Sequence, residues 1–353
     1  MYQRLKSSSS NLIFSPISIF LSLSMTSLGA RGSTKFQINR SLRQGNMKRF
    51  VHQASRILLS KMPESTGNIT HQQANAIFVR RPIPIQNSFK TRVARYYETE
   101  IYNLSTWYPE REINHWVERR TDGLLSDFLS PGSLGDSFMM WIINAVFFRG
   151  TWAKIFDFRQ TRQKSFTRES GMTTRVEMME MIESFPSYRM ENMQTSVLEI
   201  PYVGGQYSFF IFLPDTHNGL QRLESEMTHR LLESVMTNME PPKRFSIQIP
   251  KLYLDNSLDL EGTLKEMGIT KLFDANDANI AGISANNDLF VDSVIHKSVL
   301  EVNEFGTTAM TVNRVSVSVK TTVPQFIANR PFMFIVRNKK YKINMYMGRF
   351  AYP

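Results

Sequence analysis

The chain contains no cysteine among its 353 residues. This absence excludes a disulfide-stabilised scaffold, a thiol nucleophile and every cysteine-based metal site. It does not decide the cellular compartment, because a domain of this size needs no disulfides to be stable. The composition, 42% hydrophobic and 12% aromatic, is instead typical of a chain that folds around one large core.

Sequence signatures of common enzyme sites are also missing. The chain has no Gly-x-Ser-x-Gly elbow, no His-Glu-x-x-His, no phosphate-binding loop and no Gly-x-Gly-x-x-Gly. The six histidines, at positions 52, 71, 115, 217, 229 and 296, show no metal-ligand spacing. We therefore expect a protein that is not an enzyme, holds no metal and requires no cofactor.

Long hydrophobic runs are absent too. The longest, Phe138–Phe148, is shorter than the roughly 20 residues of a membrane span and predicts a buried strand. The segment Asn11–Ala30 imitates a signal peptide, but Pro16 and several serines interrupt it. We interpret it as a buried structural segment and expect no membrane span.

Negative charge is scarce in the N-terminal third of the chain. Residues 1–130 hold 18 Lys and Arg against 8 Asp and Glu, whereas the remainder is nearly neutral, and the net charge is +11. A basic surface favours polyanions, although solubility alone is an equally good explanation. The residues Lys48, Arg49, His52 and Arg56 form one helical stripe and are the candidate site for a sulfated glycan.

Helical periodicity dominates the first part of the chain and strand patterns the second, which favours an α+β architecture over alternating βαβ units. We predict helices at Ile17–Leu28, Met47–Met62, Ser88–Tyr97, Arg111–Arg120, Leu220–Met236 and Leu258–Met267. We predict strands at Ile77–Val79, Trp141–Phe148, Thr195–Pro201, Tyr207–Leu213, Phe245–Leu254, Phe290–Val302 and Phe332–Arg337. No linker divides them, so we expect a single domain over 1–353.

Glycine and proline are missing between Gly306 and Pro324, where ten of the seventeen residues Thr307–Val323 are Val or Thr. These types favour extended backbone. The segments before and after it also have the residue pattern of strands. One continuous strand of more than forty residues is implausible, because strands usually have roughly 5–6 residues. The segment is therefore either an extra strand or a loop with the potential to become one.

The residues around this segment resemble the hinge signature of the serpins, the serine-protease-inhibitor superfamily. That hinge is Glu301-Val-Asn-Glu-Phe-Gly-Thr-Thr-Ala309. Other stretches that resemble family motifs follow in family order: residues 11–19, 143–152, 249–252, 267–273, 296–300, 329–332 and 347–349. Each stretch is weak alone, but together they span nearly the whole chain.

The resemblance implies a serpin-like fold of three β-sheets and eight to nine helices, with an exposed reactive-centre loop at about 305–324. It implies a suicide inhibitor: a protease cleaves the loop and becomes acylated, and the loop inserts into the large sheet before the protease can deacylate. The alternative is a non-inhibitory serpin that acts as a binding, carrier or chaperone protein.

Family spacing places the cleaved bond at Lys320–Thr321, whether counted from Glu304 or back from Pro331. A lysine there suits a protease with an acidic specificity pocket, as in trypsin-like enzymes. Position by position, the resemblance assigns a hinge at Glu304, Gly306, Thr307 and Ala309.

An inserted strand must alternate between a buried and an exposed face. One set of alternating residues is uncharged and small or β-branched: Thr307, Ala309, Thr311, Asn313, Val315 and Val317. Within this set Asn313 is the least suited to burial, because its amide would need a hydrogen-bond partner. The one charge, Arg314, belongs to the other set. The pattern is therefore compatible with insertion.

The resemblance also assigns two clusters that control opening of the sheet. The shutter is Ser15, Ser18, Asn144 and His296, and the residues themselves favour a hydrogen bond between the last two. The breach is Trp152, Lys251 and Glu304.

The expected partners are a trypsin-like serine protease in covalent complex and, as a separate hypothesis, heparin or another glycosaminoglycan. We expect a monomer without nucleic-acid partners. Sequons at Asn39, Asn68 and Asn103 are compatible with secretion, and we expect an extracellular or cell-surface protein.

Overall fold

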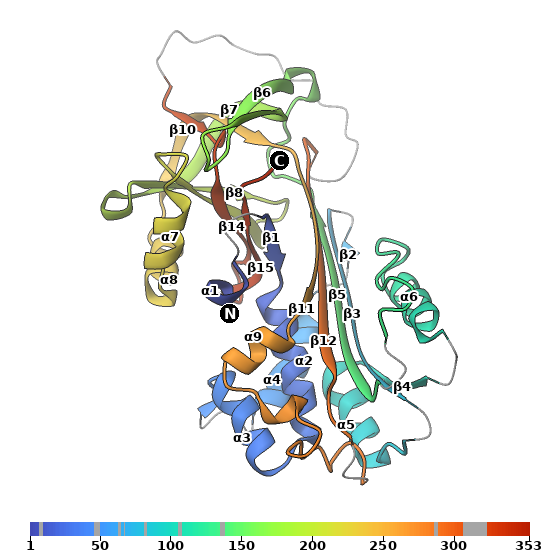
Figure 1. The fold of residues 1–353 in the computed structure, drawn as a ribbon. Helices are drawn as coiled ribbons and strands as arrows, with labels where there is room; N and C mark the ends of the chain where they lie inside the picture. Colours follow the sequence, from blue (N-terminus) through green and yellow to red (C-terminus); the bar gives the residue numbers. More distant parts are fainter. Residues whose placement is uncertain are drawn as a thin grey trace.

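A computed structural model describes residues 1–6, 10–45, 50–62, 65–66, 68–80, 83–104, 108–134, 138–285, 289–305 and 323–353. The described residues form nine α-helices. They are α1 (Tyr2–Leu5), α2 (Pro16–Gly29), α3 (Gly32–Ser41), α4 (Val51–Lys61), α5 (Asn87–Tyr97), α6 (Pro109–Arg120), α7 (Leu220–Glu226), α8 (His229–Thr237) and α9 (Glu261–Glu266). Most helices gather at one end of the molecule, α6 lies on the other side of a large sheet from α2, and α7 and α8 lie beside a second body of strands at the other end (Figure 1).

Helix α2 is the buried helix that the sequence predicts. It begins at Pro16, whose fixed backbone angle suits the first turn, and the Ser15 hydroxyl accepts the Ser18 N–H at 3.3 Å. Eleven of its fourteen residues are buried, so it is surrounded by protein on nearly all sides. Its first turn therefore lies deep in the core, next to the large sheet.

The large sheet has six strands in the order β11 (Leu252–Asp259), β12 (Ser293–Val302), β5 (Met140–Gly150), β3 (Ile69–Arg80) and β2 (Ser65–Thr66), with β4 (Ile101–Leu104) beside β3. Both of its faces are covered. Ile142 and Phe148 pack in the core that includes α2, whereas Ile143 and Phe147 pack with Trp116 of α6. Burial on both faces explains the continuous apolar run of β5.

The remaining strands form a nine-stranded sheet in the order β1, β15, β14, β9, β8, β7, β10 and β13, with β6 beside β7. The 18-residue β7 joins two parts of it, because one end pairs with β6 and β10 and the other with β8. The resemblance implies three sheets. Two of them form one continuous sheet here, because β7 belongs to both. The bounds are β1 (Leu12–Phe14), β6 (Arg162–Thr167), β7 (Thr173–Met190), β8 (Thr195–Pro201), β9 (Tyr207–Pro214), β10 (Glu240–Pro250), β13 (Gln325–Ile327), β14 (Phe332–Asn338) and β15 (Ile343–Phe350).

The α+β class is confirmed, and several predicted boundaries are wrong, among them the start of β3 (Ile69–Arg80), predicted as Ile77–Val79. The predicted strand Phe245–Leu254 is two strands in different sheets, because β10 ends at Pro250 and β11 begins at Leu252. The predicted helix Leu220–Met236 is two helices, because the Thr228 side chain caps a new helix by accepting the Leu231 N–H. The predicted helix Leu258–Met267 is shorter in the structure, because β11 extends to Asp259 and occupies its first residues.

Candidate functional site along strands β5 and β12

Strands β5 and β12 lie side by side at the centre of the six-stranded sheet and run parallel. Their register extends from Ser293 opposite Trp141 to Leu300 opposite Phe148. The outer neighbours, β3 and β11, are antiparallel to them. Parallel pairing is slightly less stable per residue than antiparallel pairing. The chain leaves β12 at Val302, so a strand that turned back between β5 and β12 would be antiparallel to both.

Trp152 lies just beyond the end of β5 and holds the segment that follows β12. Its indole N–H donates to the Asn303 carbonyl at 2.8 Å, and its backbone N–H donates to the Phe305 carbonyl at 3.3 Å. The ring is buried and stacks on Tyr202 with 4.4 Å between centroids. The last described residues before position 306 are therefore fixed to the end of β5.

Lys251 and Glu304 form an ion pair at this end of the sheet, with 2.9 Å between Nζ and Oε1. The Thr161 hydroxyl donates to the same Glu304 oxygen at 2.7 Å, and Glu177 lies 3.6 Å from Lys251. The Glu304 side chain is only 6% exposed, whereas Lys251 is 32% exposed. The structure thus brings the three predicted breach residues together, and their role stays a prediction.

The ion pair shifts the pKa values of both partners. Burial alone would raise the pKa of Glu304, but hydrogen bonds from Lys251 and Thr161 outweigh it and leave that pKa below its ordinary value. Burial alone would lower the pKa of Lys251, but Glu304 outweighs it and leaves that pKa raised. Both groups are therefore charged at neutral pH, and the contribution from Glu304 is lost as pH falls through its lowered pKa.

His296 and Asn144 occupy directly opposed positions on β12 and β5. Both are buried and hydrogen-bonded through His296 Nδ1 and Asn144 Oδ1, as the sequence predicts. The Ser15 N–H donates to His296 Nε2 at 2.9 Å, which assigns the proton of the neutral ring to Nδ1. One histidine thus connects the seam between β5 and β12 to the start of α2.

The sequence missed three further members of this hydrogen-bonded cluster. The Asn144 amide nitrogen contacts Ser18 Oγ, Ser22 Oγ at 3.2 Å and Asn75 Oδ1. Ser298 Oγ lies 2.7 Å from His296 Nε2. Ser22 follows Ser18 by one helical turn and so left a detectable signal, whereas Asn75 follows the polar residues His71, Gln72 and Gln73 and does not stand out in the sequence.

Acid is expected to destabilise the fold through two buried histidines. Burial lowers the pKa of His296 to about 3 and that of His71 to about 4, from an ordinary 6.5. Between these values the unfolded chain binds more protons than the native one, so stability falls as pH falls. At pH 5 each histidine is expected to cost about 2 kcal/mol.

Urea unfolding at pH 7.5 and pH 5 measures this effect. The variant His71→Phe serves as the control, because it should remove about half of the loss while His296 remains. An equal free energy of unfolding at both pH values would contradict the prediction.

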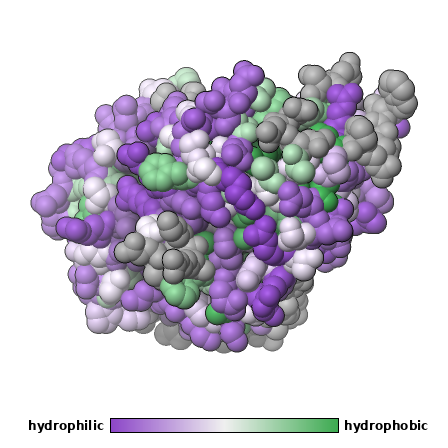
Figure 2. Space-filling model, turned by 90° about the horizontal axis from the view of Figure 1, so that it is seen from below, coloured by the Kyte–Doolittle hydropathy of each residue, from purple (hydrophilic) through white to green (hydrophobic). Residues whose placement is uncertain are grey.

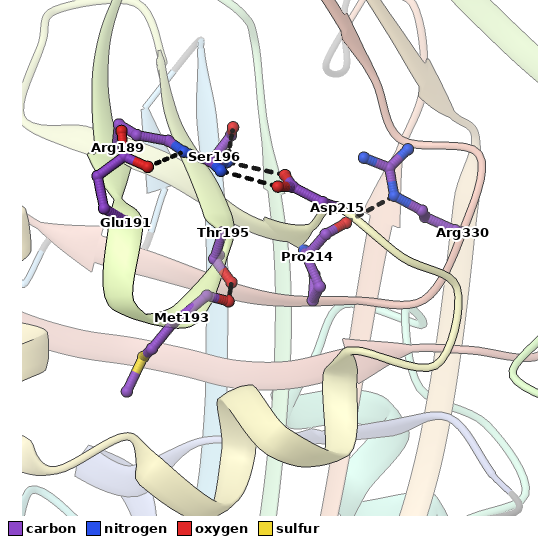
Figure 3. Close-up of polar contacts among 8 residues, drawn as sticks. All are labelled: Arg189, Glu191, Met193, Thr195, Ser196, Pro214, Asp215 and Arg330. Carbon is purple, nitrogen blue, oxygen red and sulfur yellow. Dashed lines mark hydrogen bonds and ion pairs between the residues drawn. The ribbon is translucent and has the colours of Figure 1, made fainter.

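The described chain resumes at position 323 and enters strand β13 directly after Pro324. It pairs in parallel with β10, and the Ser246 N–H also donates to the Pro324 carbonyl at 2.9 Å. Arg330 secures the following turn, because its Nε donates to the Pro214 carbonyl at 2.6 Å (Figure 3). Its Nη1 also donates to the Ile327 carbonyl at 3.2 Å. Burial lowers the pKa of Arg330 below its ordinary value.

Asp215 strengthens the strand ends to which Arg330 is bound. Its carboxylate accepts two hydrogen bonds from Arg189, at 2.8 and 2.7 Å, and Arg189 also contacts Glu191 and Ser196 (Figure 3). Paired donors of this kind fix orientation as well as distance. The chain is therefore anchored before position 306 and after position 322, at opposite edges of this end of the molecule.

Comparison with known proteins decides the family. The family model "Serpin (serine protease inhibitor)" matches residues 1–353. The chain is a serpin. It is 30% identical over 357 residues to Serpin B6 of Pongo abelii, covering 99% of this chain and 95% of the relative. It is 32% identical to the leukocyte elastase inhibitor of Xenopus tropicalis, covering 97% and 93% of the two chains.

The fold comparison agrees. Uncleaved ovalbumin superposes with a TM-score of 0.89 and 27% identity over 98% of this serpin and 94% of that chain. The expected serpin fold is therefore confirmed. Proteins similar to this chain include inhibitors and non-inhibitory serpins such as ovalbumin, and serpins are mostly protease inhibitors rather than enzymes.

One expectation is wrong. The extracellular or cell-surface location is contradicted by relatives such as Serpin B6, Serpin B3 and leukocyte elastase inhibitor, which are intracellular clade B serpins. Sequons misled the prediction, because a chain rich in Asn, Ser and Thr contains some by chance. None of the helices in the described part of this serpin has the length and hydrophobicity of a membrane span.

Several predicted site residues lie outside the described residues of the serpin. They are the hinge residues Gly306, Thr307 and Ala309, the reactive bond Lys320–Thr321, and the basic residues Lys48 and Arg49. Their assigned roles stay predictions. The described histidines and carboxylates include no group of three placed to hold a metal ion.

Only half of the predicted glycan stripe can be placed on the serpin fold. Arg56 is exposed on α4, whereas His52 is half-buried and lies 2.6 Å from the Tyr97 hydroxyl. His52 therefore contributes a neutral ring rather than a surface charge, since burial, together with Lys35 and Arg92, lowers its pKa to about 4.

Proposed function

We propose that this serpin inhibits a trypsin-like serine protease and that Lys320–Thr321 is the bond the protease attacks. The observation that carries the proposal is the direct parallel pairing of β5 and β12, with an alternating, β-branched segment tethered beside their ends. If this segment inserted as a strand, it would be antiparallel to both β5 and β12 and could form backbone hydrogen bonds with both at once.

The proposed reaction begins as ordinary proteolysis. The protease serine attacks the Lys320 carbonyl, the amine of Thr321 leaves with a proton, and Lys320 remains esterified to the protease. The freed segment then turns back at Glu304 and enters between β5 and β12. The attached protease moves with Lys320, and its distortion prevents hydrolysis of the ester.

Breaking the β5–β12 pair must expose the hydrogen-bonded cluster at its centre. His296 and Asn144 face each other across this pair, so their bond resists opening of the sheet before cleavage. Lys251 and Glu304 restrain the end at which insertion would begin. These restraints favour a loop that stays outside the sheet until its far end is cut.

Incubation with trypsin tests the proposal. We expect a covalent complex that survives detergent and the release of a peptide starting at Thr321. The variant Lys320→Ala should lower the rate of complex formation at least about 100-fold, and the control Arg314→Ala should leave it nearly unchanged. Quantitative cleavage after Lys320 without any complex would refute inhibition.

That last outcome would favour the second candidate, a non-inhibitory serpin. Similarity to uncleaved ovalbumin is the observation in its support. The hinge carries no proline or charge among its alternating, potentially buried residues, and this favours the inhibitory reading. We further propose action inside the cell, in line with the clade B relatives, and a monomeric state.

A polyanion such as heparin is a separate proposed partner. Arg56 and the neighbouring Lys48 and Arg49 supply the charges. Salt-sensitive retention on heparin should fall when Arg49 and Arg56 are changed together to Glu. Joint reversal of Arg175 and Arg244, exposed arginines on β7 and β10, changes the net charge equally; it is the control and should cause a smaller loss. Equal losses would indicate net charge alone.

A further inference from the structure

Helices α3, α4 and α5 enclose a hollow of about 750 Å³ on the side of the molecule remote from β13. This volume lies within the roughly 300–1,000 Å³ of small-molecule sites. Its lining combines apolar and basic side chains from four helices. The members are Leu28, Gly32, Lys35, Phe36, Asn39, Arg40, Gly45, His52 and Arg92.

Basic groups converge on this hollow from three directions. Lys35 and Arg40 come from α3, His52 from α4 and Arg92 from α5. In the described part of the chain, neither Arg40 nor Arg92 forms an ion pair with a carboxylate. These two guanidinium groups add positive charge to the hollow, and an anion bound between them would be attracted to both.

The ring of His52 is oriented so that it can donate into this site. The Tyr97 hydroxyl is held 2.6 Å from His52 Nδ1 and interacts with the Ser24 hydroxyl. Burial raises the pKa of Tyr97 above its ordinary value, so the hydroxyl keeps its proton and is available to donate it to Nδ1. In the tautomer in which Nδ1 accepts this proton, the ring proton lies on Nε2 and is a neutral donor for an anion.

Apolar side chains cover the rest of the hollow. Leu28 is buried in its wall, and the Phe36 side chain is 62% exposed. The end of the molecule that carries α3 and α5 is otherwise mostly hydrophilic, with isolated hydrophobic side chains (Figure 2). Leu28 and Phe36 therefore give the hollow an apolar wall beside its basic groups, against which an apolar part of a ligand can pack.

We propose that this hollow binds a small amphiphile that carries one oxyanion, a sulfate, phosphate or carboxylate, on a short apolar body. The oxyanion lies among Lys35, Arg40 and Arg92 and accepts the His52 N–H. The apolar body lies against Leu28 and Phe36. The site is distinct from the proposed reactive bond, because it lies on a side of the molecule remote from the end of β12 and the start of β13 (Figure 1).

Isothermal titration calorimetry on the intact protein tests the proposal with four probes. Octyl sulfate and octanoate carry both parts, octanol lacks the charge, and inorganic sulfate lacks the apolar body. We expect one molecule of octyl sulfate to bind per chain, at least about tenfold more tightly than octanol or inorganic sulfate. Equal affinities for octyl sulfate and octanol would overturn the proposal.

Matched variants locate the binding. Arg92→Gln and Lys35→Gln should each weaken octyl sulfate at least about fivefold, whereas Lys90→Gln, which removes an exposed lysine of α5 outside the hollow, should not. Wild-type affinity in both pocket variants would overturn the assignment. His52 belongs both to this hollow and to the proposed polyanion stripe. Pocket variants that lose heparin retention but keep their affinity for octyl sulfate would therefore also overturn the assignment. The trypsin reaction is expected to be the same in all three variants.

Discussion

Cleavage at Lys320–Thr321 is expected to raise the melting temperature of this serpin by more than about 10 °C. The freed segment would add a central strand to the six-stranded sheet and bury about six side chains, worth roughly 1–2 kcal/mol each. For a chain of this size, each kcal/mol corresponds to about 2 °C. Differential scanning fluorimetry of the intact protein and of the nicked protein, separated from covalent complex by chromatography after trypsin treatment, measures the change.

Two variants separate insertion from a general effect of cleavage. Val315→Glu places a charge on the face that would be buried, whereas Ser316→Glu places it on the face left to solvent. After cleavage, Ser316→Glu should show nearly the full rise and Val315→Glu little of it. The same small change in wild type and both variants would mean that the cut segment does not enter the sheet.

Replacement of Asn144 by alanine is expected to lower the free energy of unfolding by about 3–4 kcal/mol. Asn144 binds His296 across the β5–β12 pair and reaches Ser18 and Asn75 on its other side. Its loss leaves the buried His296 N–H without an acceptor, and an unsatisfied buried donor alone costs about 1–3 kcal/mol. Urea unfolding at pH 7.5 measures the loss.

Ser22→Ala is the graded control for this experiment. It removes a single longer contact, 3.2 Å from the Asn144 amide, and should cost about 1 kcal/mol. Size-exclusion chromatography should also show more self-association for Asn144→Ala, because the seam opens more easily and the segment after Gly306 is β-prone. Equal stabilities of the two variants would contradict the central place given to Asn144.

The sequence predicted the cluster at the β5–β12 seam better than it predicted the ends of elements. A polar Asn144 inside an apolar strand must find a partner, and His296 is a polar residue inside another strand. Their pairing could therefore be argued before the register was known. Asn75 obeys the same rule on β3 and was missed, because the predicted strand, Ile77–Val79, began after it.

Boundaries failed where a local pattern continues across a change of partner. Strands β10 and β11 read as one apolar alternation, yet Lys251 separates them and the two strands lie in different sheets. The periodicity of apolar side chains does not indicate where the chain passes from one sheet to another. The amphipathic period also continues from α7 into α8, and only the capping hydroxyl of Thr228 marks the break.

The position of β14 determines what becomes of the two polypeptides that a cut at Lys320 would produce. The smaller piece carries β13, β14 and β15, and β14 is sandwiched between β9 and β15, with the Arg330 clasp on Pro214. These ladders do not depend on the peptide bond at 320. The nicked molecule should therefore migrate as one particle in native buffer and separate into two bands only when it is unfolded.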